Sequence, residues 1–263
     1  MVALAVLGLA VVGAMVLVIP YELRAHPGAV PVNSVVKGFK GNSSSAGGRL
    51  AFALPQQGVY VVKGRGSEQI NVPPNSQRDG ATMPASVTYV KHGCWRWRVD
   101  YNVAHWEAYN FCPTSANLLE GAEVNWQSWD FGTVKVTNLE QVTCRPPAVV
   151  VPGTPRPGQT FRWTCAGANT AVSGTTRQQV VVHLVGTTNL VIGGKATPTV
   201  HEVLDTSLSG VQHGSVTENW WFSRTSGLPV KMTRTVVINS TSPIGTVTYH
   251  EDGSWQMASL DPK

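Results

Sequence analysis

Seven histidines are the side chains of this sequence best suited to acid–base or metal chemistry near neutral pH. None of them stands in the H-E-x-x-H pattern that brings two zinc ligands to one face of a helix. The sequence also lacks the G-x-S-x-G elbow of hydrolases, the P-loop and the glycine-rich dinucleotide motif. We therefore predict a protein that is not an enzyme and has no cofactor or metal site; a hydrolase assembled from distant residues is the alternative. The histidines are His26, His92, His105, His183, His201, His213 and His250.

Nine tryptophans form the second group, because an indole ring can bind a sugar or a lipid tail as well as pack in a core. In the strand expected after Cys94, strict alternation places Trp95 and Trp97 on one face, which we expect to be core. Arg96 and Arg98 take the other face, which is either solvated or a surface for anionic groups. The candidate ligand-surface residues are Arg96, Arg98, Trp220 and Trp221.

The four cysteines permit three disulfide pairings. An aromatic strand follows Cys94 and another precedes Cys112, and the two are expected to fold about Val103 as a hairpin. Opposed residues of such a hairpin lie about 4.5–5.5 Å apart, which a disulfide can bridge. Cys144 and Cys165 are then left to pair with each other. Free thiols or a zinc site are the alternative, but the sequence has no C-x-x-C pair, and disulfides indicate a compartment outside the cytoplasm.

The composition is typical of strands and turns. Only 13% of the residues are charged, whereas 26 glycines and 17 prolines separate runs of β-branched and aromatic residues. We predict a mainly β protein of antiparallel curved sheets, an open half-barrel or a sandwich, after one N-terminal transmembrane helix. The first β block, 49–145, is expected to carry a disulfide, and a Pro-rich linker, 146–158, is expected to join it to the second β block, 159–263.

Residues 1–20 carry no charge and could cross about 30 Å of hydrocarbon as a helix. We expect an uncleaved transmembrane anchor here, with a cleaved signal segment as the alternative. Residues 21–48 are rich in Gly, Ser and Pro, which is typical of a flexible tether. The basic excess between Arg24 and Arg65 would face the cytoplasm by the positive-inside rule. The cysteines favour the opposite orientation, which we adopt.

These segments predict a protein on the extracytoplasmic face of a cell membrane, or a secreted one if the N-terminal segment is cleaved. A net charge of +5 and a pI of about 9.1 would suit nucleic acid, but an exported β domain rarely meets it. Basic residues beside a membrane are instead attracted to anionic lipid, by about 1 kcal/mol per charge. The expected partners are the membrane, through the N-terminal helix, and a lipid, a glycan or an envelope protein.

A family resemblance is carried by the runs PQQGVYVVKGRGSE, WEAYNFC, PG-x-x-F/W-x-x-x-C, WWFSRTSGLPVKM and SPIGTVTYHEDGSWQMASLDPK. In order and spacing, over most of residues 50–263, they resemble a family of exported actinobacterial proteins of uncharacterised function. The second block also resembles the curved sheets of lipoprotein carriers of the LolA type. The resemblance implies an open, concave sheet able to hold an apolar molecule and supplies no catalytic residues. The expected function is an extracytoplasmic, membrane-anchored binding or structural module of the cell envelope.

Overall fold

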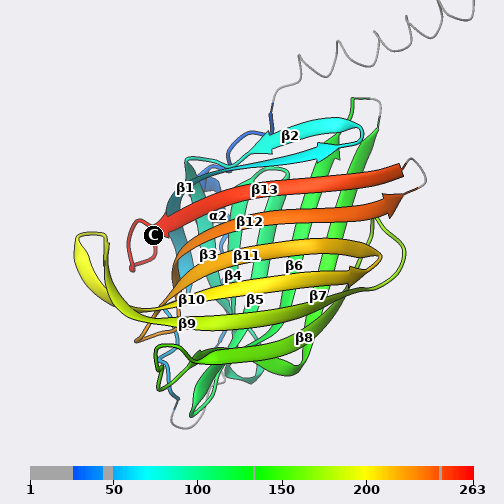
Figure 1. Ribbon diagram of the computed structural model, residues 1–263. Coiled ribbons are helices and arrows are strands. Elements are labelled where there is room, and N and C mark those ends of the chain that lie inside the picture. The colour runs from blue at the N-terminus through cyan, green and yellow to red at the C-terminus, as the bar shows by residue number, and fades with distance from the viewer. Residues whose placement is uncertain (1–25, 44–49, 133, 243–244) are drawn as a thin grey trace, which may run out of the picture.

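The computed structural model describes residues 26–43, 50–132, 134–242 and 245–263 (Figure 1). The expected transmembrane or signal segment, 1–20, lies outside these residues. Within the described ranges, no helix combines the length and the hydrophobicity that crossing a bilayer would require.

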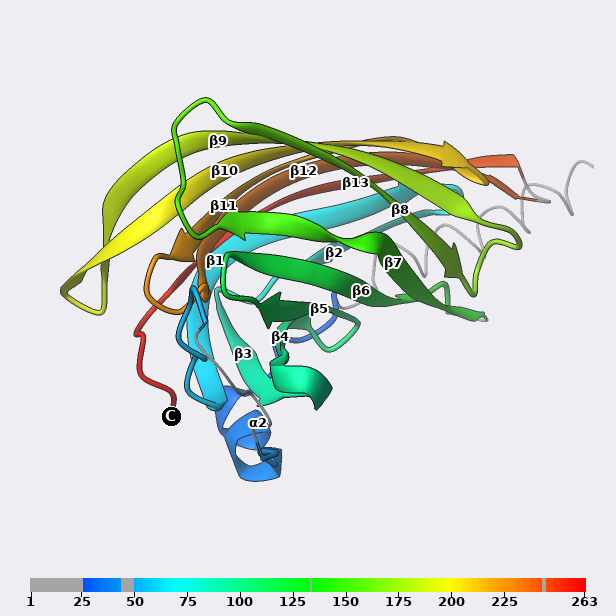
Figure 2. The same cartoon turned by 90° about the horizontal axis from the view of Figure 1, so that it is seen from below.

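Thirteen antiparallel strands form one sheet, and twelve of them close into a barrel (Figures 1 and 2). Closure occurs where β1 pairs with β13, with Val62 opposite Met257 and Ile70 opposite Tyr249. The thirteenth strand, β2, pairs with the end of β1. The elements are α2 Val32–Gly38, β1 Gly58–Asn71, β2 Pro74–Arg78, β3 Thr82–Tyr89, the 3-10 turn Lys91–Gly93, β4 Trp95–Asn102, β5 His105–Pro113, β6 Asn117–Asp130, β7 Lys135–Pro152, β8 Thr160–Asn169, β9 Thr176–Ile192, β10 Lys195–Gly210, β11 Gln212–Ser223, β12 Pro229–Ser242 and β13 Gly245–Met257.

The closed barrel confirms the mainly β, antiparallel prediction and corrects its finer part. An open half-barrel or a sandwich would leave the first and last long strands unpaired, whereas here they pair with each other. Closure satisfies the backbone groups that an open sheet exposes at its edges. The two expected β blocks are therefore parts of one sheet rather than separate units.

The Pro-rich stretch 146–158 is not a simple linker, because β7 continues through it to Pro152 and pairs with β6. The pairing with β6 is interrupted locally: Glu120 faces Ala148, whereas Ala122 faces Thr143. The prolines at positions 146 and 147 lie inside this irregularity, where no ladder hydrogen bond needs their missing N–H. A bulge therefore lets proline occupy a strand where the sequence predicted a linker.

The expected tether, 21–48, is in contact with the barrel over the part that the structure describes. Its helix α2 packs against β1 and β3 on the outside of the barrel (Figure 2). Val103, in the turn between β4 and β5, donates its backbone N–H to the carbonyl of Gly28 over 3.0 Å. Residues 26–43 are therefore docked, and the expectation of a free tether is corrected for them.

Both predicted disulfides are present. Cys94 is bonded to Cys112 with a Cα–Cα separation of 4.2 Å, and Cys144 to Cys165 with a separation of 4.1 Å. The first bond follows from the hairpin register, in which Trp95 lies opposite the residue before Cys112. The second joins directly opposed residues at the end of the ladder between β7 and β8. The two disulfides fix the register of β4 against β5 and of β7 against β8.

One end of the barrel interior is a packed aromatic core. Trp97 and Trp220 both contact Trp255, at ring-centroid distances of 5.9 and 5.8 Å. The expectation that Trp95 and Trp97 face the core is confirmed, since both are completely buried. The large aromatic members of this core include Tyr60, Trp95, Trp97, Phe111, Trp220, Phe222 and Trp255.

The chain that precedes β1 crosses this aromatic end of the barrel. Ala51 donates its backbone N–H to the carbonyl of Thr114 over 2.7 Å, and Ala53 donates to the carbonyl of Thr225 over 2.9 Å. Phe52, between them, is buried in the core. The aromatic end is thus covered by backbone as well as filled by side chains.

Candidate ligand-binding cavity

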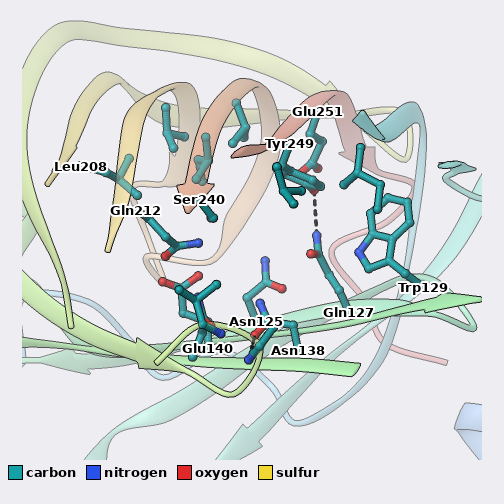
Figure 3. Close-up of a pocket in the computed structure, with 18 of the residues that line it drawn as sticks. Asn125, Gln127, Trp129, Asn138, Glu140, Leu208, Gln212, Ser240, Tyr249 and Glu251 are labelled. Atoms are coloured by element: carbon teal, nitrogen blue, oxygen red, sulfur yellow. Dashed lines mark hydrogen bonds between the residues drawn. The ribbon is translucent and has the colours of Figure 1, made fainter. Parts of the chain in front are cut away.

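The other end of the barrel interior holds a cavity of about 450 Å³ (Figure 3). Its position follows from the strands: β12 contributes Met232 to the core and Val236 to the cavity, and β13 contributes Trp255 to the core and Val247 to the cavity. Pockets that bind small molecules have volumes of about 300–1,000 Å³. The cavity is therefore large enough for a ligand.

One wall of the cavity consists of hydrogen-bonding side chains on β6 and β7. Alternation along β6 directs Asn125, Gln127 and Trp129 to the same side, and β7 adds Asn138 and Glu140 (Figure 3). Amides both donate and accept hydrogen bonds, so this wall can satisfy several polar groups of a ligand.

The facing wall, on β11 to β13, brings four aliphatic side chains together, and the same strands also carry Glu218 and the Arg234–Glu251 pair. Its branched side chains are Val216, Val236, Ile238 and Val247. Tyr249 joins the two walls, because its hydroxyl accepts a 2.7 Å hydrogen bond from the side-chain amide of Gln127 (Figure 3). A polar wall opposite an aliphatic wall suits a molecule that is itself amphipathic.

Beneath the cavity lies a buried ionic cluster centred on Arg234. Its Nη1 donates to Oε2 of Glu107 over 2.5 Å, and its Nε donates to Oε1 of Glu251 over 2.6 Å. The hydroxyls of Tyr101 and Tyr109 donate to the same Glu107 oxygen, over 3.0 and 2.9 Å.

Burial alone would raise the pKa of Glu107, but Arg234 and the nearby imidazole of His105 hold it well below its usual range. Burial raises the pKa of Glu251 to about 7 despite the same guanidinium.

The cluster continues to His105, which is completely buried. Its Nδ1 lies 2.7 Å from Oε1 of Glu68. Burial by itself would lower the pKa of His105, but the carboxylates around it, Glu68 foremost, raise it well above its usual value. The Gln127 amide and the Tyr249 hydroxyl both donate to the second oxygen of Glu68, over 3.2 and 3.3 Å. These contacts fix the side chains at the base of the polar wall.

Three further carboxyl groups line the cavity without a cation. Among the described residues, no ion pair involves Glu123, Glu140 or Glu218. Burial raises the pKa of Glu218 to about 7, and burial with repulsion from Glu107 raises that of Glu140 to about 7. The pKa of Glu123 is raised well above its usual value, by burial first and by the surrounding carboxylates second. These groups therefore carry protons at mildly acidic pH.

Two acceptor atoms of the lining residues are both buried from solvent and without a donor among the described residues. Oε1 of Glu140 and Oδ1 of Asn125 are inaccessible to solvent and have no hydrogen-bond partner among the described residues. The amide nitrogen of the same Asn125 is satisfied, since it donates to Glu107 over 2.7 Å. Unpaired buried acceptors are costly, so they identify positions where a donor is expected.

Arg96 and Arg98 lie on the outer face of the barrel, as alternation predicted. The Nε of Arg96 donates to Oδ1 of Asn110 over 2.9 Å. Arg98 forms a 2.5 Å ion pair with Asp100, and its guanidinium lies 4.0 Å from the centre of the Trp106 ring. Both side chains therefore have partners within the chain, and neither lines the cavity.

The two tryptophans expected at a ligand surface lie on opposite sides of β11. Trp220 is only 3% exposed and belongs to the aromatic core, so it does not lie on the outer surface, and its contact with a ligand stays a prediction. Trp221 faces outward, stacked on His201 at 4.2 Å, with Nζ of Lys231 4.3 Å from its ring. Successive residues of a strand point to opposite faces, which separates the pair.

Sequence reasoning missed the acidic residues of the cavity. The signal that could have found them is alternation along β6, where Glu123 falls on the same face as Asn125, Gln127 and Trp129. That face was not recognised as interior, because charged and amide side chains usually point to solvent. No protein family, curated protein or solved structure matches this chain.

Proposed function

We propose that this protein is an extracytoplasmic, membrane-anchored binding module of the cell envelope whose barrel holds a small amphipathic molecule, derived from a lipid or a glycan. The observation that carries the proposal is the 450 Å³ cavity, with its hydrogen-bonding wall facing an aliphatic wall. A purely architectural barrel would gain stability by filling this space with side chains, as it does at the aromatic end. Large barrels that leave such a space are typical ligand carriers.

The extracytoplasmic location is supported by the two disulfides, which persist in oxidising compartments. The uncharged segment 1–20 supports a membrane anchor, because it is long enough to cross the hydrocarbon of a bilayer as a helix. A protease that cannot cross the membrane should therefore digest the region after Leu50 in intact cells. Protection of that region until the cells are lysed would reject the location and leave the cavity unaffected.

The binding proposal is tested by native mass spectrometry of the detergent-extracted, full-length protein, with a search for a co-purified small molecule. Val216→Phe extends a ring from the aliphatic wall into the cavity and should abolish the adduct. Val185→Phe is the matched control, because Val185 is 52% exposed on the outside of β9. An adduct that survives Val216→Phe, or no adduct after incubation with envelope extract, would overturn the proposal.

A hydrolase is the second candidate, favoured by carboxyl groups of different ionisation in one cavity. Glu107 is held ionised by Arg234, whereas Glu140 titrates near pH 7. A carboxylate and a neutral carboxyl group side by side are the usual pair for acid–base catalysis of hydrolysis. Turnover of chromogenic aryl glycosides or esters that Glu140→Gln abolishes would favour this candidate, and binding without turnover would reject it.

A further inference from the structure

We infer that the ligand of the cavity carries a cationic amine, which lies against Glu123, Glu140 and Glu218, and a hydrocarbon part, which packs on the aliphatic wall. This inference rests on the proposed binding function. It specifies the chemical class of the ligand, which the amphipathic walls alone leave open.

The charges lining the cavity are unbalanced. Five carboxyl groups line it, those of Glu107, Glu123, Glu140, Glu218 and Glu251, against a single guanidinium, that of Arg234. Two of the five are already paired with that guanidinium, which has a carboxylate on each side. The remaining three carboxyl groups form no ion pair among the described residues. A cation supplied by the ligand would provide the counter-charge.

The unsatisfied atoms of the cavity give an independent argument. Both Oε1 of Glu140 and Oδ1 of Asn125 are acceptors, so the buried side-chain atoms of this wall that lack a partner among the described residues are ones that a donor would satisfy. An ammonium group supplies three N–H donors and no acceptor. Among the lining atoms that are inaccessible to solvent, Nη2 of Arg234 is the one donor without a hydrogen bond within the described residues, and it lies beside the carboxylate of Glu251. The polar wall therefore matches an amine in hydrogen bonding as well as in charge.

An anionic amphiphile fits the same cavity poorly. A fatty-acid carboxylate or a phosphate would need a free cation, and Arg234 is occupied by Glu107 and Glu251. It would also lie beside carboxyl groups, where like charges repel strongly in a poorly solvated site. A neutral alcohol could donate one hydrogen bond but would bring no charge to favour the ionised form of these carboxyl groups. The amine is therefore favoured over both.

Because the carboxyl groups of the cavity titrate, the affinity for an amine should depend on pH. The groups around Glu123 that set its charge are Glu107, Glu120, Glu140 and Glu218, with Arg234 beneath them. Glu140 and Glu218 lose their protons near pH 7, whereas an alkylamine stays charged up to about pH 10. Amine affinity should therefore rise between pH 6 and pH 8, and binding at pH 7 should release protons from the protein.

The test is isothermal titration calorimetry of the full chain with octylamine, octanol and octanoate, three probes that share one alkyl chain. Octylamine should bind tighter than octanol by about tenfold, the value of one charge-assisted hydrogen bond, and octanoate should bind weakest. Glu123→Gln combined with Glu218→Gln should remove the preference for the amine, so that octylamine binds no tighter than octanol. Asp205→Asn is the control, since it removes an exposed carboxylate on the outer face of β10.

Proton release gives a readout that a structural role would not produce. Titrations in two buffers of different ionisation enthalpy should report protons released on octylamine binding and none on octanol binding. Thermal melts of the double variant should show no loss of stability, because burial raises the pKa of both carboxyl groups and neither forms an ion pair among the described residues. Octanol or octanoate binding as tightly as octylamine would overturn the inference and leave the proposed function standing. Failure of all three probes to bind would overturn both.

Discussion

The guanidinium of Arg234 on β12 and the carboxylate of Glu107 on β5 meet inside the barrel, at 2.5 Å and 127 positions apart in the chain. Both side chains are 3% exposed. Arg234 is also hydrogen-bonded to Glu251 on the neighbouring strand β13. This relationship ties the first β block to the second across the interior and forms the base of the cavity.

Removing Arg234 should destabilise the fold strongly. Arg234→Met would leave Glu107 and Glu251 buried without their cation, a change that costs about 3–5 kcal/mol in comparable buried pairs. Urea denaturation measures the loss in free energy of unfolding. Arg96→Met is the control, because Arg96 is exposed on the outer face, where such a change costs about 1 kcal/mol or less. Equal effects of the two variants would show that the buried cluster contributes little.

Loss of the first disulfide should lower stability rather than binding. The bond between Cys94 and Cys112 closes a loop of 18 residues, for which chain entropy gives roughly 3 kcal/mol. Cys112→Ser should therefore lower the melting temperature by about 6–12 °C in a chain of this size. Reductant should lower the melting temperature of the wild type toward that of the variant. An unchanged melting temperature in Cys112→Ser would reject the structural role and indicate a thiol function.

The local features of the fold could be predicted because they depend on short-range geometry. The two-residue period of a strand places Trp97 and Arg98 on opposite faces of β4. The same period sets the hairpin register that brings Cys94 to Cys112. Closure could not be predicted in this way. The pairing of Val62 with Met257 joins segments nearly a whole chain apart, and no local pattern encodes such a partner.

The polar interior of the barrel could not be predicted from the sequence for a different reason, the burial of charged side chains. Alternation places Glu202 on the same face of β10 as Val200 and Leu204, which predicts a face that is only partly buried. In the structure Glu202 is completely buried with them. Glu202 is buried in the barrel, and Glu123 and Glu218 line its cavity, against the usual preference of charged side chains for solvent. Sequence patterns place a residue on a face, but burial of a charged face depends on the closed barrel around it.

Replacing Glu202 should stabilise the protein at neutral pH. Neither carboxyl oxygen of Glu202 has a hydrogen-bond partner among the described residues, and burial raises its pKa well above the usual value. Glu202→Gln removes the titration, so its advantage in unfolding free energy should grow by about 1.4 kcal/mol per pH unit above pH 5. Asp205→Asn, on the outer face of the same strand, should have no such effect. A pH-independent difference between Glu202→Gln and wild type would contradict the assignment.

The whole protein should be most stable in mildly acidic solution. Burial raises the pKa of Glu140, Glu218 and Glu251 to about 7 and that of Glu120 to about 8, against 4.5 when unfolded. The folded state therefore binds more protons than the unfolded state between pH 4.5 and these values. Stability must then fall as pH rises through this window, by about 1.4 kcal/mol per pH unit for each group that differs. The raised pKa of His105 acts in the same direction, since its contribution is complete below pH 6.5 and is lost above.

The loss of stability at low pH has a different cause, a carboxyl group whose pKa is lowered in the folded protein. The pKa of Glu107 is held low by Arg234 and His105, so its contribution is present above pH 4.5 and is lost as the pH falls. Urea midpoints should therefore peak near pH 5 and decrease toward both pH 3 and pH 8. Glu218→Gln should flatten the alkaline limb, because it removes one proton-binding difference, and should leave the acid limb unchanged. A wild-type midpoint that increases from pH 5 to pH 8 would mean that the cavity carboxyl groups are ionised in the folded protein, each with a cation beside it.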